Sequence, residues 1–344
     1  MSADNRNRLS LVELNERIVP AIALANATFV GGTLTVTGSR LADNIVIGVA
    51  GDYVTVTNNG IPVSIKEGNT RVPSVLGFDL HLIKIFGGDG NDNINANQGH
   101  TGFAGVITQP TEIHGGNGDD TIVGTKGNNL IYGEAGNDKI STWDGNDSVF
   151  GMDGNDTITT RLGNDTVYGG YGNDNINAGD GNNSVFADDG DDTVIAGIGN
   201  DSIFGGFGND TINAGDGTNT VFGESGNDVI TTGQGNDSID GGEGDDSISA
   251  GAGNDIIFGA LGNDTIIAGD GLDTIYGGQG NDSIDGGDGN DSIFGELGDD
   301  TITTGLGADY AQGGGGADTY NANSSEDDFD FGGDEDIDTL NETP

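Results

Sequence analysis

The sequence predicts an all-β fold, a parallel β-solenoid with eighteen residues per coil, and three observations support this prediction. A nonapeptide repeats twenty-three times without a break from Gly115 to Asn321. Its fourth position is always Gly, and its eighth is Ile or Val except at Ala311 and Tyr320. Its sixth position is Asp in all but three copies. Repeats this short bury apolar side chains only against neighbouring copies, so they are expected to stack.

Each repeat divides into a turn and a strand, as in GGFGNDTIN (205–213) and GGEGDDSIS (241–249). Positions seven to nine indicate a three-residue strand with one inward side chain, because side chains alternate faces along a strand. Positions one to six must reverse the chain, and glycine supplies the positive φ angles that tight turns need. Two repeats then make one coil, and strands eighteen residues apart stack in parallel at ~4.8 Å. Two sheets would face each other across a thin Ile/Val core.

Stacked turns place the position-six aspartates in two files, one along each edge of the solenoid. We call these the first edge and the second edge. The first edge would carry Asp120, Asp138, Asp156, Asp174, Asp192, Asp210, Asp228, Asp246, Asp264, Asp282, Asp300 and Asp318. The second edge would carry Asp147, Asp165, Asp201, Asp237, Asp255, Asp273, Asp291 and Asp309, together with Asn129, Asn183 and Asn219. An isolated earlier copy, GGDGNDNIN (87–95), adds Asp92.

A file of carboxylates ~4.8 Å apart repels itself unless cations lie between neighbours. Carboxylate and loop carbonyl oxygens are hard ligands that suit Ca²⁺, while the sequence has no Cys and no clustered His for a softer metal. The alternative is that each Asp caps its own turn through local hydrogen bonds.

The repeat matches the pattern G-G-x-G-x-D-x-U-x, and the chain resembles RTX-type (hemolysin-type) β-roll proteins over roughly two thirds of its length. The resemblance implies calcium ions between adjacent turns, held by the position-six aspartates and by backbone carbonyls. One ion per carboxylate loop would give on the order of twenty ions. We expect weaker or missing calcium near Asn183 and Asn219, because an amide supplies no charge.

Composition points to the same chemistry. The 344 residues carry a formal charge of −47 with only ten Lys plus Arg, which excludes nucleic acid and argues against anionic membrane surfaces. Without ions such a chain is expected to be disordered, so folding and metal binding should be one event. Calcium at the level this requires is extracellular, which predicts a secreted or cell-surface protein. The sequence has no run of eighteen apolar residues, so we expect no transmembrane segment.

The flanking regions divide the chain further. We expect residues 1–26 to form an export or capping segment. RLSLVELNERIVPA within it is similar to a short N-terminal motif of secreted or surface proteins of planctomycetes, although Asn15 departs from that motif. Residues 27–86 alternate with period two and predict degenerate solenoid coils. The calcium β-roll is expected over 87–321, with a phase break at 96–114, and 322–344 read as a flexible acidic tail.

Position nine carries an aromatic residue in every second copy. These residues are Tyr132, Phe150, Tyr168, Phe186, Phe204 and Phe222, and the series resumes after Asp240 with Phe258, Tyr276 and Phe294. This aromatic ladder is either a self-stacked stripe or a surface that docks a second rod, the N-terminal segment or a cell-surface partner.

Three function classes remain. We favour a non-enzymatic extracellular calcium-binding rod with a structural or adhesive role. The second is a carbohydrate- or ice-binding surface on the opposite, Thr/Ser/Asn-rich face. The third is the accessory module of a secreted hydrolase, but the sequence has neither H-E-x-x-H nor G-x-S-x-G, and three scattered histidines complete no triad.

Overall fold

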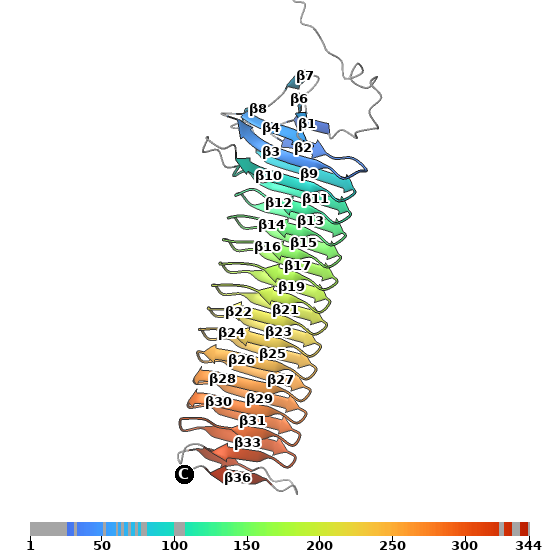
Figure 1. The fold of residues 1–344 in the computed structure, drawn as a ribbon. Coiled ribbons are helices and arrows are strands. Elements are labelled where there is room, and N and C mark those ends of the chain that lie inside the picture. The colour runs from blue at the N-terminus through green and yellow to red at the C-terminus, as the bar shows by residue number, and fades with distance from the viewer. Residues whose placement is uncertain are drawn as a thin grey trace, which may run out of the picture.

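The computed structural model describes residues 26–30, 33–50, 53–59, 61–62, 65–67, 70–72, 75–76, 81–99, 107–322, 327–331 and 338–342. Apart from Asn26, the segment expected to direct export or to cap the rod lies outside these residues. All regular structure within them is strand, and the predicted parallel β-solenoid is confirmed (Figure 1). Accordingly, the described residues include no helix long and apolar enough to cross a membrane.

The coils form two sheets that face each other, each with 18 strands among the described residues. Sheet I contains β1 (Asn26–Val30), β2 (Thr33–Thr37), β6 (Ile65–Glu67), β7 (Thr70–Val72), β9 (Leu82–Asp89), β11 (Thr111–Asn117), β13 (Asn129–Ala135), β15 (Ser148–Asp153), β17 (Thr166–Tyr171), β19 (Ser184–Asp189), β21 (Ser202–Phe207), β23 (Thr220–Ser225), β25 (Ser238–Glu243), β27 (Ile256–Leu261), β29 (Thr274–Gln279), β31 (Ser292–Leu297), β33 (Tyr310–Gly315) and β35 (Asp328–Asp330). Sheet II contains β3 (Asn44–Ala50), β4 (Tyr53–Asn58), β5 (Ile61–Pro62), β8 (Val75–Leu76), β10 (Asn93–Gly99), β12 (Thr121–Val123), β14 (Lys139–Ser141), β16 (Thr157–Thr159), β18 (Asn175–Asn177), β20 (Thr193–Ile195), β22 (Thr211–Gly215), β24 (Val229–Thr232), β26 (Ser247–Ala252), β28 (Thr265–Gly271), β30 (Ser283–Gly289), β32 (Thr301–Thr303), β34 (Thr319–Ala322) and β36 (Thr339–Glu342).

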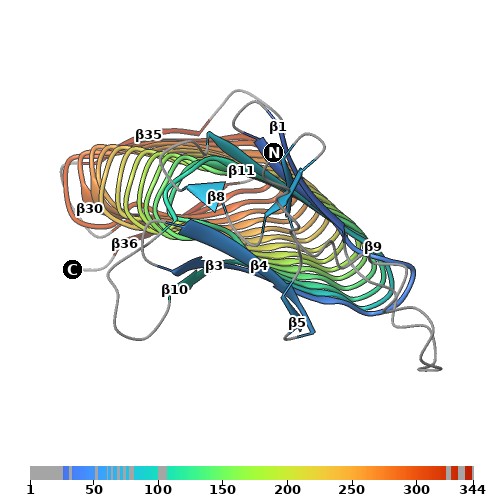
Figure 2. The same cartoon turned by 90° about the horizontal axis from the view of Figure 1, so that it is seen from above.

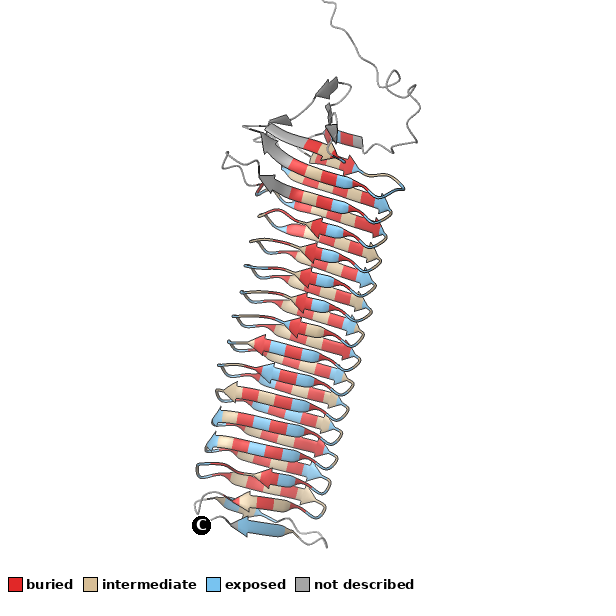
Figure 3. Ribbon diagram, in the orientation of Figure 1, coloured by how far each residue is buried: buried red, intermediate tan, exposed pale blue. Residues whose placement is uncertain are grey.

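Neighbouring strands of the regular run are parallel and eighteen residues apart. In sheet I, Ile203 lies opposite Val221, and in sheet II, Ile212 lies opposite Ile230. Viewed along the stack, the coils superpose as a flattened tube (Figure 2). The position-eight side chains fill this tube and are almost completely buried, which gives the alternating stripes of Figure 3. One thin core therefore runs the length of the rod.

The two sheets differ in strand length. Several sheet II strands have the three residues expected from the sequence, such as β16. Most sheet I strands of the run have six, because pairing resumes at positions two and three of the next repeat. The pairing skips position one: Phe204 lies opposite Phe222 and Gly206 opposite Glu224, while Gly205 has no registered partner. Each turn of the first edge thus begins with an irregularity in strand pairing at position one.

Further strands continue the rod beyond the regular run at both ends. At the N-terminal end, β1 pairs antiparallel with β2 and β4 with β3, and Phe29 and Val56 join the core. At the C-terminal end, β35 and β36 extend the parallel sheets. The segment expected to be a flexible acidic tail therefore contains two short strands, because Phe329 packs on the core and contacts the buried Tyr320 ring edge-on at 5.4 Å.

Candidate metal centre

The turns of the rod direct the position-six side chains inward. Position four takes a positive φ, for example 128° at Gly208, a conformation that glycine adopts without steric cost. On the first edge position two also has a positive φ, even at Glu224 (73°) and Met152 (83°). This tight path leaves Asp210 only 1% exposed. The carboxylates lie inside the turns and not on the surface of the rod.

One carboxylate oxygen joins adjacent coils. In the regular run, Oδ1 of each position-six aspartate accepts the backbone N–H of the position-six residue one coil earlier, as from Asp192 to Asp210 at 2.8 Å and from Asp147 to Asp165 at 2.8 Å. These bonds span eighteen residues and are not local caps. Because backbone N–H groups need a partner when buried, Oδ1 has a structural role on both edges.

The other oxygen has no donor. Twenty of the position-six aspartates bury Oδ2 without a hydrogen-bond partner among the described residues: Asp92, Asp120, Asp138, Asp147, Asp156, Asp165, Asp174, Asp192, Asp201, Asp210, Asp228, Asp237, Asp246, Asp255, Asp264, Asp273, Asp282, Asp291, Asp300 and Asp309. A buried charge without compensation is among the most costly features a fold can contain. So regular a set of unpartnered oxygens indicates a ligand for a cation.

Burial disfavours the charged form of these carboxyl groups and therefore raises their pKa values. It raises the pKa of Asp138 and Asp210 to about 7, and the neighbouring carboxylates of each file add to the increase. On the second edge, burial raises the pKa of Asp165 and Asp201 to about 6. A bound cation would favour the ionised form and oppose these increases.

The asparagine copies reveal what surrounds Oδ2. Asn183 places its amide nitrogen at the corresponding position, where it donates to the carbonyl oxygens of Gly179 (3.1 Å), Gly181 (3.2 Å) and Ala196 (3.2 Å). Asn219 donates to Gly215 in the same way, at 3.0 Å. In the equivalent turns with Asp, Oδ2 takes the place of this nitrogen. Both Oδ2 and the turn carbonyls are then acceptors, and no hydrogen lies between them. The asparagine amide therefore supplies the positively polarised hydrogens to the turn carbonyls that a bound cation would replace in the aspartate turns.

These surroundings fit calcium. Ca²⁺ takes six to eight oxygen ligands from carboxylates and backbone carbonyls, and both are present at each turn. In the part of the chain that the structure describes, no three or more His, Cys, Asp or Glu side chains gather at one point. The ligands at any one site would thus be one or two carboxylates and mostly carbonyls, without a soft donor.

The structure brings the predicted residues together as two files and extends both of them. Asp92 stands next to Asp120, 2.6 Å from its backbone N to Asp120 Oδ1, although 28 residues separate them. Three residues that the sequence analysis missed, Asp43, Asp327 and Asp338, continue the bonding. The backbone N–H of Asp43 donates to Asp92 Oδ1, that of Asp309 to Asp327 Oδ1, and that of Asp318 to Asp338 Oδ1. The signal for Asp43 was GSRLAD (38–43), which has Gly at position one and Asp at position six but lacks the central glycine.

The aromatic ladder lies on the outer face of sheet I and is longer than the sequence indicated. Ring centroids of successive members are 4.7–5.0 Å apart from His114 to Phe222, with nearly parallel planes. Phe86 stacks on His114 at 4.9 Å. His114 also lies 2.9 Å from Glu134 through Nδ1. The sequence analysis considered the three histidines only as scattered residues that complete no triad and missed this role, because the phase break hides the spacing of His114.

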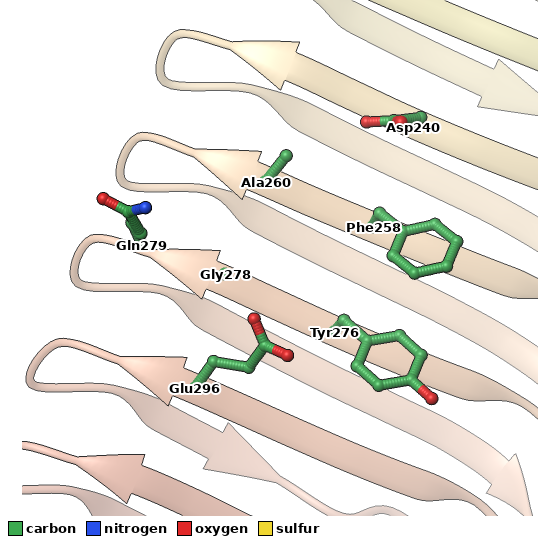
Figure 4. A pocket seen from close by; sticks show the side chains of 7 residues that line it. All are labelled: Asp240, Phe258, Ala260, Tyr276, Gly278, Gln279 and Glu296. Atoms are coloured by element: carbon green, nitrogen blue, oxygen red, sulfur yellow. The ribbon is translucent and has the colours of Figure 1, made fainter.

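A shallow groove runs beside the second part of the ladder (Figure 4). It has a volume of about 350 Å³ and is lined by Phe258 and Tyr276 on one side and by Ala260, Gly278 and Glu296 on the other. Asp240 and Gln279 complete the lining. The groove lies on the outside of sheet I, away from the buried oxygens.

A family model of calcium-binding repeats agrees with this geometry. The model of the RTX calcium-binding nonapeptide repeat matches residues 84–101 and 114–329. No curated protein matches the sequence. Among solved structures, the chain is similar to a hyperactive, Ca²⁺-dependent, β-helical antifreeze protein from an Antarctic bacterium, with 21% identity, a TM-score of 0.37, and coverage of 71% of this chain and 80% of that chain. The family match spans well over half of the sequence, and the chain therefore belongs to the RTX calcium-binding nonapeptide repeat family.

Proposed function

We propose that this protein is a non-enzymatic, extracellular rod with a structural or adhesive role, whose folding requires calcium bound by the position-six aspartates of both edges. The observation that supports it most directly is the two files of buried Oδ2 atoms without a donor. Repeat rods of this family are typically structural rather than catalytic. The described residues therefore supply a scaffold whose internal charges need cations.

The expected ion count follows from charge. On the order of twenty calcium ions, one per carboxylate loop, would bring about +40 against the formal −47. Ions bound only by the folded chain stabilise it by mass action. Calcium at these levels exists outside cells, which is the reason for proposing a secreted or cell-surface location.

The experiment is far-UV circular dichroism of the metal-stripped protein during a calcium titration, with magnesium as the control. We expect a cooperative transition from coil to β structure with calcium only, because magnesium requires a stricter octahedral geometry and loses water reluctantly. A chain that is fully β-folded in chelator at neutral pH would overturn the proposal.

We further propose that the aromatic ladder is the contact surface for a second copy of the chain. Its rings stack on each other along sheet I, and the strands β17 and β21 that carry two of them also carry the exposed Tyr171 and Phe207. Replacing Phe186, Phe204 and Phe222 by Ser should convert an oligomer to a monomer in sedimentation velocity. An unchanged sedimentation profile in calcium would remove this surface from consideration.

A second candidate function is binding of ice or carbohydrate by sheet II. One observation favours it: positions seven and nine present in-register polar pairs, such as Thr157 and Thr159 opposite Asn175 and Asn177. Exposed Ile267 interrupts this array. Thermal hysteresis or a positive glycan array with the calcium-loaded protein would support this candidate, and their absence would leave the rod without a binding role for sheet II.

A further inference from the structure

We propose that the two edges bind calcium unequally, with tight ions on the first edge and weak ions on the second, and that the residue at position one of each turn sets the difference. This inference rests on the proposed binding of calcium by the position-six aspartates. It predicts two classes of site in a chain whose repeats otherwise look alike.

Position one differs sharply between the edges. On the first edge it is Gly in every turn but one: Gly87, Gly115, Gly133, Gly151, Gly169, Gly205, Gly223, Gly241, Gly259, Gly277, Gly295 and Gly313, with Ala187 as the exception. On the second edge it is Thr142, Thr160, Thr232 and Thr304, or Ala178, Ala196, Ala214, Ala250 and Ala268, with Gly124 and Gly286 as the exceptions.

Backbone conformation does not explain the glycines at position one of the first edge. None of them has the positive φ seen at positions two and four. Ala187 also occupies this position within the first edge itself. The need for glycine must therefore come from space and not from the path of the chain.

Space at position one is taken by two oxygens. A Cβ on Gly277 would lie 2.5 Å from Asp282 Oδ2 and 2.8 Å from the carbonyl oxygen of Gly295 in the next coil. A Cβ on Gly259 would meet the corresponding oxygens, both at 2.5 Å. A carbon atom cannot approach oxygen this closely. Glycine thus lets a carboxylate oxygen and a carbonyl oxygen of adjacent coils converge, and both are ligands that calcium prefers.

On the second edge, carbon and protein donors occupy this region. The Thr160 hydroxyl donates to the carbonyl oxygen of Ala178, and the Thr232 hydroxyl donates to that of Ala250.

All three position-six asparagines, Asn129, Asn183 and Asn219, also lie on the second edge, where their side chains donate to turn carbonyls. These donors occupy turn carbonyl oxygens, which leaves fewer carbonyl ligands for a cation on the second edge. Its aspartates, like those of the first edge, still bury an Oδ2 that has no donor among the described residues.

Each edge contains one informative exception. Gly286 stands on the second edge, and a Cβ there would lie 2.6 Å from the Thr304 carbonyl oxygen and 3.0 Å from Asp291 Oδ2. We expect Asp291 to bind calcium as a first-edge residue does. Ala187 fills the corresponding space beside Asp192, which should be a weak position in an otherwise tight file.

The test counts calcium bound to the full chain by equilibrium dialysis over a range of free calcium. We expect two plateaus, the first at about a dozen ions, one per glycine-lined turn. Ala187→Gly should add one ion to the tight class, and Gly277→Ala should remove one. A single plateau in which about twenty ions bind together would overturn the inference.

A local readout comes from Trp143, the single Trp in the sequence, whose ring lies 4.3 Å from the Arg161 guanidinium on the second edge. Thr142→Gly should lower the calcium concentration at which Trp143 emission changes by 10–100-fold, the range typical of residues that support metal ligands. The matched control is Thr142→Ala, which loses the hydroxyl and keeps the carbon, and should leave that concentration nearly unchanged.

The outcomes separate this inference from the proposed function. Equal shifts for Thr142→Gly and Thr142→Ala would overturn the role of the Cβ. No calcium uptake at any concentration would overturn the proposed function itself. If a variant does not fold, the number of plateaus in the unmodified chain still decides the inference.

Discussion

At the residue scale, each buried aspartate uses its two oxygens for different purposes. Oδ1 of Asp210 accepts a backbone N–H from the adjacent coil, whereas Oδ2 has no donor within the described residues. An asparagine keeps the first interaction, as when Asn183 Oδ1 accepts the backbone N–H of Asp165, and its amide hydrogens bond the turn carbonyls in place of the second. The difference between Asp and Asn in these turns is therefore a difference in the need for a cation.

This difference predicts opposite effects with and without calcium for Asp210→Asn. At calcium a hundredfold above Kd, losing one ion should cost about 2.7 kcal/mol and lower Tm. In chelator the same variant should be at least as folded as the unmodified chain, because its amide can donate to the turn carbonyls. Thermal unfolding followed by circular dichroism measures both.

Asp153→Asn is the matched control for Asp210→Asn, since it removes the same charge from an exposed side chain. An equal loss of Tm in both variants would show that net charge, and not the buried oxygen, controls stability.

At the scale of strands, the aromatic ladder is interrupted once. Phe222 and Phe258 flank Asp240 along sheet I, and burial raises the pKa of the Asp240 carboxyl. The Asp240 carboxylate stands where an aromatic ring would stack on both Phe222 and Phe258. The interruption divides the ladder into two stacks.

Repairing the ladder with Asp240→Phe should stabilise the calcium-loaded rod. Two new aromatic contacts at about 0.5–1.5 kcal/mol each would raise the free energy of unfolding. The control is Asp285→Phe, at the same repeat position on sheet II between Ile267 and Thr303, where no ladder exists. Equal stabilisation by the two substitutions in urea titrations would attribute the gain to hydrophobicity and not to stacking.

The sequence predicts the strands and turns of the regular run better than those at its two ends. The strict period placed the parallel strands, the Ile/Val core and the two files, because one residue type at one position repeated in nearly every copy. It did not reveal Asp43, Asp327 or Asp338, where spacing departs from the period or the glycines are absent. The long sheet I strands escaped prediction because position two, glycine or not, continues the pairing through a positive φ.

At the scale of the whole molecule, protons and calcium compete for the same interior. Burial raises the pKa of Asp138, Asp174 and Asp210 from 3.8 to about 7 in the folded chain. The folded state then binds more protons than the unfolded state between these values. Its stability without calcium is present at low pH and is lost as pH rises through about 7.

Acidification should therefore substitute in part for calcium. In chelator, β structure should increase as pH falls from 8 towards 5.5, while exposed carboxyl groups remain ionised. With calcium present, the midpoint of the calcium titration should move to higher concentration over the same range. A chain that stays disordered in chelator at pH 5.5 would contradict this expectation.

The hydrogen bond from each position-six backbone N–H to Oδ1 of the next coil joins equivalent positions, so whole coils can be removed without changing the bonding of the rest. Removing eighteen residues from the regular run would take out one rung and leave every remaining pair matched, so the product should be a shorter rod of the same kind. Removing nine residues would exchange the two edges beyond the cut. First-edge turns with glycine at position one would then stack on second-edge turns with threonine, and the aromatic residues would pass to the polar sheet. Length in this fold can change only in whole coils.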